Sequence, residues 1–285
     1  MTTATAPTAP TAPYRFFDLT VLRTVRLGPS MRRITLGGPG SDGFVAGGRD
    51  QSLSIFLPPA GRTEAVVPVD ENGEWFPAWR ALPPDDRAVM RSYTVRAQRC
   101  AEDGSAEVDI DFALHEHGGP ACRWAQAAAP GQRLLVLGPT GEDNNGIRFQ
   151  PPQDTRWVLI CADETALPAA SAALEWLPAG TKARVWLEVP HGEDRLEIRT
   201  EADVHLTWLV RDEGAPSAVD AVRAADLPGE TPYAWIAGES SGVRELRRHL
   251  VRERAFDRGR VTFVGYWRRG LSEEQLREQA ARVSA

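Results

Sequence analysis

The sequence predicts an antiparallel β-barrel domain followed by an α/β domain with a parallel sheet. Six closely spaced apolar or β-branched runs occupy the first half, whereas apolar strands alternate with helical patterns in the second half. A polar, proline-containing stretch at residues 140–154 separates the two patterns and is interpreted as a linker. With 285 residues, of which 42% are apolar, the chain is long enough to bury one large core or two modest ones.

Short strands dominate the barrel domain, which is predicted to span residues 14–139. The strands are expected at 19–27, 32–36, 52–57, 88–97, 107–114 and 133–137. Clusters of Gly, Pro and Asp separate several of them, and this spacing is typical of a six-stranded antiparallel barrel. One helix is expected at 119–128. The Thr/Ala/Pro repeat of residues 1–13 predicts a disordered tail.

Strands and helices alternate in the second domain, which is predicted to span residues 155–270. The strands are expected at 157–161, 183–189, 204–210, 233–237 and 261–266, and the helices at 163–177 and 241–254. Such alternation indicates a parallel, doubly wound sheet. Residues 271–285 predict a C-terminal helix, with a capping box of Ser272 and Gln275 and a hydrophobic staple of Leu271 and Leu276.

Composition argues against several functional classes. Lys plus Arg number 33 and Asp plus Glu 39, so the net charge of −6 is the wrong balance for nucleic-acid binding through phosphates. Cys100, Cys122 and Cys161 are widely spaced, which argues against a disulfide framework, a zinc ribbon and a cysteine-bound iron–sulfur cluster. Without a disulfide framework, a reducing cytoplasm is the expected location. We find no signal peptide and no apolar stretch suited to stable membrane insertion.

The strand at 88–97 contains Arg91-Ser92-Tyr93-Thr94-Val95-Arg96. In an extended strand alternate side chains point the same way, so Arg91 and Tyr93 share one face and Thr94 lies on the other. An arginine at a strand start can bind a phosphate, an aromatic ring can pack on a flat heterocycle, and a threonine hydroxyl can reach its polar edge. The alternative is an ordinary barrel strand with exposed arginines.

A second motif, His115-Glu116-His117-Gly118-Gly119-Pro120-Ala121, follows about twenty residues later. Proline suits the first helical position, and a helix start of this kind presents free N–H groups to an anion. The alternative is a strand-to-helix turn with no ligand. His115 and His117 lack a further cluster of ligands, so no protein-bound metal is expected.

Two further segments follow strands of the predicted parallel sheet, at the edge where open α/β sheets bind ligands. Asp163-Glu164-Thr165-Ala166-Leu167-Pro168 follows the first strand, and Asp163 also suits a plain N-cap. Gly238-Glu239 follows the fourth strand. The sequence contains no G-x-G-x-x-G fingerprint.

Together and in this order, these segments resemble the siderophore-interacting protein family, the flavin-dependent ferric-siderophore reductases of the ferredoxin-reductase-like superfamily. The resemblance covers nearly the whole chain after residue 13 and includes Trp124-Ala125 and Gly265-Tyr266-Trp267-Arg268-Arg269-Gly270. It implies FAD in the barrel domain and NADPH or NADH on the α/β domain. The implied cofactor-binding residues are Arg91, Ser92, Tyr93, Thr94, His115, His117, Gly118, Gly119, Pro120, Ala121, Trp124, Asp163, Glu164, Thr165, Ala166, Gly238, Glu239, Tyr266 and Trp267.

Position within the motifs assigns these residues to parts of the cofactors. Arg91 is expected at the FAD phosphates, Tyr93 beside the flavin, Thr94 near its redox edge, and residues 119–121 at the pyrophosphate. Residues 163–165 are expected near the nicotinamide, which residues 238–239 help to seat. Tyr266 and Trp267 are expected near the flavin at the domain junction, and His115 beside the cofactor.

The implied activity is reduction of ferric siderophores with electrons passed from NAD(P)H through FAD. Electron transfer through the flavin requires no catalytic acid, base or nucleophile from the protein. Ferric siderophores are often anionic, so Arg96, Arg268 and Arg269 are the candidate substrate contacts. One departure is Ala162, where the family usually has glycine, and its methyl group is expected to narrow the approach to the nicotinamide.

The sequence is also compatible with other functions. A general flavin reductase or a ferredoxin–NADP-type reductase would keep the same domains, with ferredoxin as the alternative electron donor. A flavin-bearing siderophore-binding protein without turnover is a third hypothesis. The choice between NADH and NADPH is also open, because Glu188 favours a ribose hydroxyl and Arg195 a 2′-phosphate.

Overall fold

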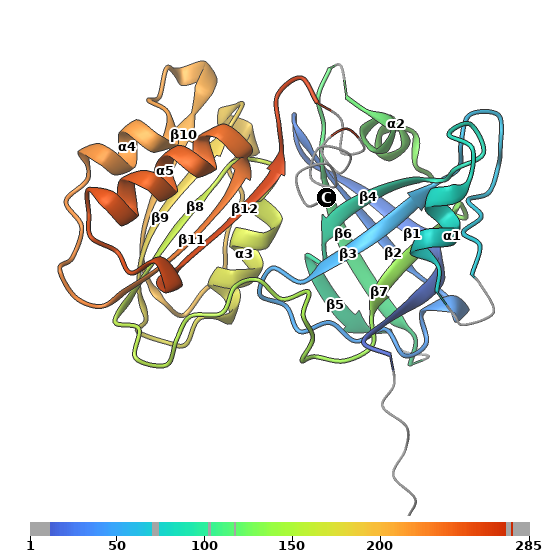
Figure 1. The fold of residues 1–285 in the computed structure, drawn as a ribbon, viewed down its shortest axis with the longest axis horizontal. Coiled ribbons are helices and arrows are strands. Elements are labelled where there is room, and N and C mark those ends of the chain that lie inside the picture. Colours follow the sequence, from blue (N-terminus) through green and yellow to red (C-terminus); the bar gives the residue numbers. More distant parts are fainter. Residues whose placement is uncertain (1–11, 70–73, 102–103, 117, 272–274, 276–285) are drawn as a thin grey trace, which may run out of the picture.

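The computed structural model describes residues 12–69, 74–101, 104–116, 118–271 and 275. Two domains lie side by side, an antiparallel β domain and an α/β domain, and this confirms the predicted fold class (Figure 1). The predicted N-terminal tail and C-terminal helix lie outside the described residues, apart from residues 12, 13, 271 and 275. No helix in the described ranges has the length and apolarity needed to cross a membrane.

The first domain is a curled antiparallel sheet of seven strands in the order β4-β3-β7-β1-β2-β6-β5. Its strands are β1 (Tyr14–Gly28), β2 (Met31–Gly37), β3 (Ser52–Leu57), β4 (Val89–Thr94), β5 (Ala97–Cys100), β6 (Ala106–Ala113) and β7 (Arg133–Pro139). Alternate residues along the strands, such as Leu19, Ile34 and Ile110, are fully buried and form its core. Helices α1 (Phe76–Ala81) and α2 (Pro120–Ala127) pack at its rim.

The predicted six-stranded barrel requires a correction, because the expected strand at 88–97 is divided into β4 and β5. The chain changes partner between them: β4 pairs with β3, and β5 pairs with β6. At the crossing, the Val95 amide donates to the Gln51 carbonyl over 2.8 Å, and the Arg96 amide donates to the Asp109 carbonyl over 2.9 Å. The two residues therefore join the opposite ends of the strand order, which curls the sheet.

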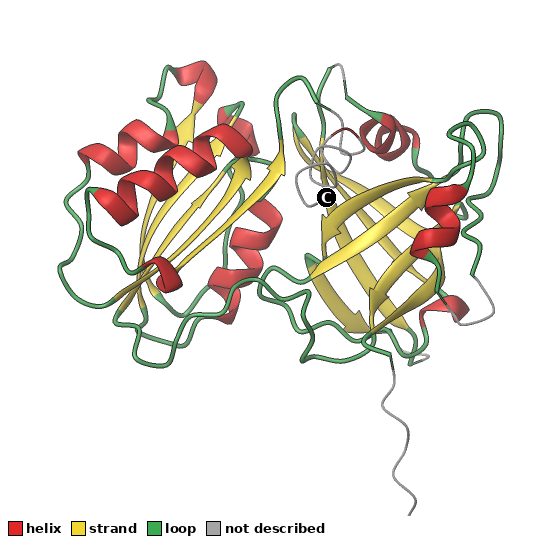
Figure 2. Ribbon diagram, in the orientation of Figure 1, coloured by secondary structure: helices red, strands yellow, loops and turns green. Residues whose placement is uncertain are grey.

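The second domain is a parallel sheet of five strands in the order β10-β9-β8-β11-β12. These are β8 (Trp157–Ala162), β9 (Lys182–Val189), β10 (Asp203–Val210), β11 (Pro232–Glu239) and β12 (Val261–Trp267), each at its predicted place. All six residues of β8 are buried, as expected for a central strand covered on both faces. α3 (Leu167–Trp176) covers the face toward the barrel, and α4 (Ala218–Ala224) and α5 (Ser240–Arg252) cover the other (Figures 1 and 2).

Apolar and polar contacts hold the two domains together. Met31 of β2 is 1% exposed because it packs into the apolar cluster of the α/β domain, beside Phe149. Arg96 of the barrel domain forms a two-pronged ion pair with Glu175 of α3, at 2.8 and 2.6 Å. These contacts hold α3 and the apolar cluster beneath it against the barrel domain.

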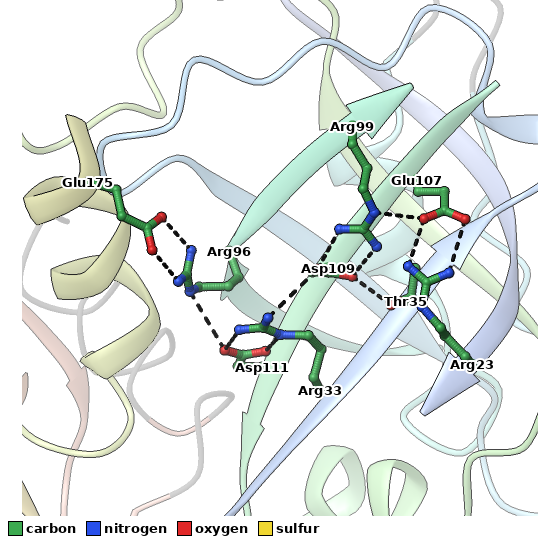
Figure 3. A network of polar contacts seen from close by, with 9 residues as sticks. All are labelled: Arg23, Arg33, Thr35, Arg96, Arg99, Glu107, Asp109, Asp111 and Glu175. Carbon is green, nitrogen blue, oxygen red and sulfur yellow. Dashed lines mark hydrogen bonds and ion pairs between the residues drawn. The ribbon is translucent and has the colours of Figure 1, made fainter. Parts of the chain in front are cut away.

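A polar network extends from this ion pair over the outer face of β1, β2, β5 and β6, where arginines and carboxylates alternate (Figure 3). Asp111, whose side chain is fully buried, accepts from Arg33 at 2.7 and 2.8 Å and lies 3.9 Å from Arg96. The members farther from the junction are Arg23, Thr35, Arg99, Glu107 and Asp109. The network thus links barrel strands to α3.

Candidate functional site

Two adjoining cavities lie at the junction of the domains, beside the carboxyl ends of the parallel strands. The larger has a volume of about 640 Å³ and the smaller about 300 Å³. Gly119, Thr165, Trp267 and Leu271 border both, so the cavities are neighbours that share part of their walls. The predicted motifs of the two domains therefore meet at one site.

The smaller cavity is formed by β4, the start of α2 and the end of β12. Residues 91–94 line it, together with Pro120 and Tyr266. The Tyr93 ring packs on Phe112 with ring centroids 4.4 Å apart, and Trp124 also packs on Phe112, with centroids 5.6 Å apart. Trp124 therefore supports the cavity wall from behind, and it does not line the cavity.

The start of α2 has the features of an anion-binding helix terminus. Pro120 occupies the first turn, and Gly119 is the N-cap and forms no side-chain capping bond. A Cβ at Gly118 would overlap the Cys122 sulfur, whereas space is open around Gly119. Amide groups of such a turn are available to a phosphate. Ala121 is buried in the barrel core instead of facing the cavity.

The two predicted histidines have different outcomes. His115 lines the larger cavity, and its backbone amide lies 3.3 Å from the Cys122 sulfur, which holds the turn before α2. His117 lies outside the described residues. Among the residues that the structure describes, no group of three or more His, Cys, Asp or Glu side chains is arranged to hold a metal ion.

Asp163 joins its own loop to the ends of β11 and β12 at the edge of the parallel sheet. One carboxylate oxygen accepts from the Thr165 amide at 2.9 Å and from its hydroxyl at 2.5 Å. The other accepts from the Glu239 amide and from the indole N–H of Trp267, both at 2.8 Å. Burial raises the pKa of the Asp163 carboxyl to about 6, and the charge of Glu164 contributes in the same direction.

This arrangement corrects the prediction that Asp163 caps a helix at 163–177. The helix begins at Leu167, its N-cap is Ala166, and no side chain caps it. Residues 163–166 form a turn because the Asp163 carboxylate binds Thr165 of its own loop and also Glu239 and Trp267. Ala166 itself is fully buried beneath α3.

Gly238 supports Asp163 from β11. Its φ of 140° lies in the range that L side chains rarely adopt, and a Cβ there would lie 2.5 Å from an Asp163 oxygen. Gly238 thus acts behind the cavity lining, whereas Glu239, Thr165 and Trp267 border the cavity itself.

Sequence reasoning missed Arg211, which follows β10 and borders the larger cavity. Its guanidinium binds both oxygens of the buried Glu164 at 2.9 and 2.8 Å, and Glu188 at 2.9 Å. Its place directly after a predicted strand, on the same sheet edge as the motifs, was the available signal. Arg195, weighed as a phosphate contact, pairs with Glu213 at 2.6 Å and does not border either cavity.

The three candidate substrate arginines separate into two groups. Arg268 and Arg269 border the larger cavity. Arg96 borders neither cavity and lies in the ion pair with Glu175. Ala162 borders the larger cavity, and it also belongs to the apolar cluster beneath α3.

The residues present fit a flavin and a pyridine nucleotide. The smaller cavity combines three aromatic residues, several hydroxyl groups and Arg91 with the glycine-rich start of α2. The larger cavity lies at the carboxyl ends of β8, β9 and β11, where parallel sheets bind nucleotides. Both the open space at Gly119 and the shared wall of the cavities accord with two neighbouring ligands.

Comparisons with known proteins agree with this reading. The chain matches the family model described as siderophore-interacting protein over residues 155–270 and that of the siderophore-interacting FAD-binding domain over residues 20–143. It is 32% identical over 265 residues to the ferric vibriobactin reductase ViuB of Vibrio cholerae, covering 92% of each chain. It is also 32% identical over 263 residues to the NADPH-dependent ferric-chelate reductase of Escherichia coli, covering 89% of this chain and 93% of that one.

Solved structures give the same result. The siderophore-interacting protein SipS from Aeromonas hydrophila has a TM-score of 0.75 at 35% identity, over 95% of this chain and 98% of that one. A siderophore utilization protein from T. fusca has a TM-score of 0.77 at 32% identity, over 92% and 95% of the two chains. A ferredoxin reductase of carbazole 1,9a-dioxygenase, at 16% identity and a TM-score of 0.62 over 90% of this chain and 71% of that one, shares the fold.

Proposed function

Because this chain belongs to the siderophore-interacting protein family, we propose that it is an NAD(P)H-dependent ferric-siderophore reductase that uses FAD. The observation that carries the proposal is the pair of adjoining cavities, one beside the barrel motif and one beside the parallel strands. Two similar proteins are named as reductases of a ferric siderophore and of ferric chelates.

When bound, FAD would supply the redox chemistry, which is two-electron exchange with NAD(P)H and one-electron exchange with the ferric chelate. One NAD(P)H would then reduce two ferric ions and release one proton. Siderophore oxygen donors hold Fe(III) far better than Fe(II), and reduction therefore loosens the metal. The protein supplies binding, orientation and a site where the ferric chelate comes near the flavin.

We assign the FAD phosphates to Arg91 and the amides at the start of α2, and the flavin ring to Tyr93, Thr94 and Tyr266. Support comes from their common place around the smaller cavity. We propose that the nicotinamide binds beside Thr165, Glu239 and Trp267, because the Asp163 carboxylate holds these three residues in place.

The substrate contacts proposed are Arg268 and Arg269, which follow β12 at the mouth of the larger cavity. They give a local positive charge on a chain whose net charge is −6. Arg96 is left out of this set because Glu175 engages its guanidinium. The need for NAD(P)H and the three free thiols accord with the reducing cytoplasm as the place of action.

The first test is anaerobic mixing of FAD-loaded protein with NADPH or NADH, followed by a ferric siderophore and an Fe(II) trap. Bleaching of the flavin by nicotinamide, followed by reoxidation and trapped Fe(II) only after siderophore addition, is the expected result. The same experiment is run with reduced ferredoxin. If reduced ferredoxin bleaches the flavin and NAD(P)H does not, the electron donor is ferredoxin. A flavin bleached by neither donor would support a carrier instead of a reductase.

The substrate assignment has its own test. We expect the double variant Arg268→Glu/Arg269→Glu to raise KM for an anionic ferric siderophore by about tenfold or more, equal to ~1.4 kcal/mol. The matched control is Arg199→Glu, because Arg199 is exposed and lies outside both cavity linings. An unchanged KM in the double variant would remove Arg268 and Arg269 from the substrate site.

A further inference from the structure

Asp50 is a buried carboxylate that none of the predicted motifs contains. Its side chain is completely shielded from solvent, although it precedes β3 in a loop. Gly48, Arg49 and Asp50 have successive φ values of 63°, 53° and 60°, so the chain adopts the left-handed region three times in a row. Residues other than glycine rarely adopt this conformation, and such strain concentrates at functional positions.

The strained loop carries the Asp50 carboxylate from the barrel domain into the α/β domain. One oxygen accepts from the indole N–H of Trp235 in β11 at 3.1 Å. The other accepts from the Tyr266 hydroxyl of β12, and Arg148 lies 3.9 Å from that oxygen. The Tyr266 hydroxyl is in turn 3.5 Å from the Thr94 hydroxyl. Tyr266 and Thr94 both line the smaller cavity.

While Asp50 is ionised, the hydrogen bonds among Asp50, Tyr266 and Thr94 can run in only one direction. An ionised carboxylate only accepts, so the Tyr266 O–H points to Asp50. The Tyr266 oxygen is then the acceptor toward Thr94, whose O–H points to Tyr266. The Thr94 oxygen consequently offers a lone pair, and no proton, to a group in the cavity.

We propose that Asp50 is a positioning residue that sets the direction of the Asp50–Tyr266–Thr94 hydrogen bonds, so that Thr94 favours the reduced form of the bound flavin. This inference rests on the proposed function, together with the expectation from the family resemblance that the redox edge of the flavin lies near Thr94. The ring nitrogen there carries a hydrogen in reduced flavin and only a lone pair in oxidised flavin. An acceptor at Thr94 can therefore accept a hydrogen bond from reduced flavin, whereas it faces a second lone pair in oxidised flavin.

The variant Asp50→Asn reverses the donor and acceptor roles in the hydrogen bonds that connect residue 50 to Tyr266 and Thr94. The Trp235 N–H is only a donor, so the amide oxygen of Asn must face Trp235 and its NH₂ group must face Tyr266. The Tyr266 O–H then points to Thr94, and the Thr94 O–H points into the cavity. The variant is close in shape to the native residue, and it should weaken the preference for reduced over oxidised flavin.

The test is the midpoint potential of bound FAD, measured by equilibration with a reference dye. We expect Asp50→Asn to make the potential more negative, as a roughly three- to tenfold loss of the preference for reduced over oxidised FAD. Tyr266→Phe removes the hydroxyl that connects Asp50 to Thr94. Adding Asp50→Asn to Tyr266→Phe should therefore give no further shift of the midpoint potential. A shift of the same size in both backgrounds would overturn the proposal, since it would reflect a general change at the domain junction.

A pH series provides an independent arm. Burial raises the pKa of Asp50 to about 6, against the opposing effects of the Tyr266 and Trp235 donors and the Arg148 charge. The nearby phenol of Tyr233 stays neutral, because burial raises its pKa above the usual 10.0. Below pH 6 the native carboxyl carries a proton and resembles Asn, so the difference in potential between native protein and Asp50→Asn should shrink. A difference that is constant from pH 5 to pH 8 would contradict the inference.

The outcomes separate this inference from the proposed function. Protein that binds FAD and is bleached by NAD(P)H, but shows no shift in Asp50→Asn, loses only the role of Asp50. Protein that binds no FAD loses the proposed function and this inference together.

Discussion

Gly238 is a residue at which one added methyl group would disturb the nucleotide side of the site. We expect Gly238→Ala to displace the Asp163 carboxylate, because the new Cβ would lie 2.5 Å from its oxygen at a φ of 140°. Stability should fall by about 2 kcal/mol, and the Kd for NAD(P)H should rise as Glu239 and Trp267 lose their common acceptor. Urea unfolding and nucleotide titration measure the two effects.

The control for this variant is Gly229→Ala, since no atom lies within 4 Å of a Cβ at that position. It should change stability by less than about 0.5 kcal/mol. Equal effects of the two substitutions would show that the contact between Gly238 and Asp163 is unimportant.

Cysteine reactivity distinguishes the three thiols. Cys161 borders the larger cavity, yet burial raises the pKa of its thiol, and the charges of Glu188 and Asp163 raise it further. Thiolate is the reactive form, so we expect iodoacetamide at pH 8 to label the exposed Cys100 and to leave Cys161 unmodified. Mass mapping of peptides gives the answer, with urea-unfolded protein as the control in which all three cysteines react. Fast labelling of Cys161 in the folded protein would contradict the predicted burial.

Among the elements, β2 and β6 carry the part of the polar network that should contribute most to stability. Asp111 of β6 has a fully buried side chain, and Arg33 of β2 is 25% exposed. Asp111→Asn leaves Arg33 without its main carboxylate and should cost about 3 kcal/mol. Arg23→Gln breaks a pair whose members are 47% and 18% exposed, and it should cost less than about 1 kcal/mol. Comparable losses in urea unfolding would argue against burial as the deciding factor.

Most elements could be predicted because their patterns are local. β8 is an uninterrupted apolar run, and its complete burial is the physical reason for that run. The division of 88–97 into β4 and β5 was not visible, because it depends on bonds from Val95 and Arg96 to distant carbonyls. α1, with six residues, and α4, with seven, are too short to show a clear helical period.

The site was predictable to the extent that backbone chemistry defines it. The glycine-rich start of α2 and the loops after β8 and β11 are short motifs with local causes. Asp50 has no such motif, since its importance arises from Trp235 and Tyr266, which are distant in sequence. Arg211 was missed for the same reason, because its partner Glu164 lies on a different strand end.

On the scale of the whole molecule, the smaller cavity draws its wall from both domains. Residues 91–94 belong to the barrel domain, whereas Tyr266 and Trp267 belong to the α/β domain. We therefore expect FAD at about 100 times its Kd to stabilise the protein by about 2.7 kcal/mol and to raise Tm by about 5–10 °C in one joint transition. Calorimetry of apo and FAD-loaded protein tests this. Two separate transitions, with only one of them shifted, would show that FAD contacts a single domain.

The order of strands along the chain also bears on how the protein is made. Tyr266 and Trp267 lie in β12, the last strand of the sheet, whereas residues 91–94 emerge from the ribosome much earlier. A nascent chain that ends after β11 would thus possess the phosphate-binding turn of α2 but lack one wall of the flavin cavity. Stable capture of the cofactor should accordingly wait until synthesis has passed β12, and ribosome-stalled fragments shorter than this should remain colourless in the presence of FAD.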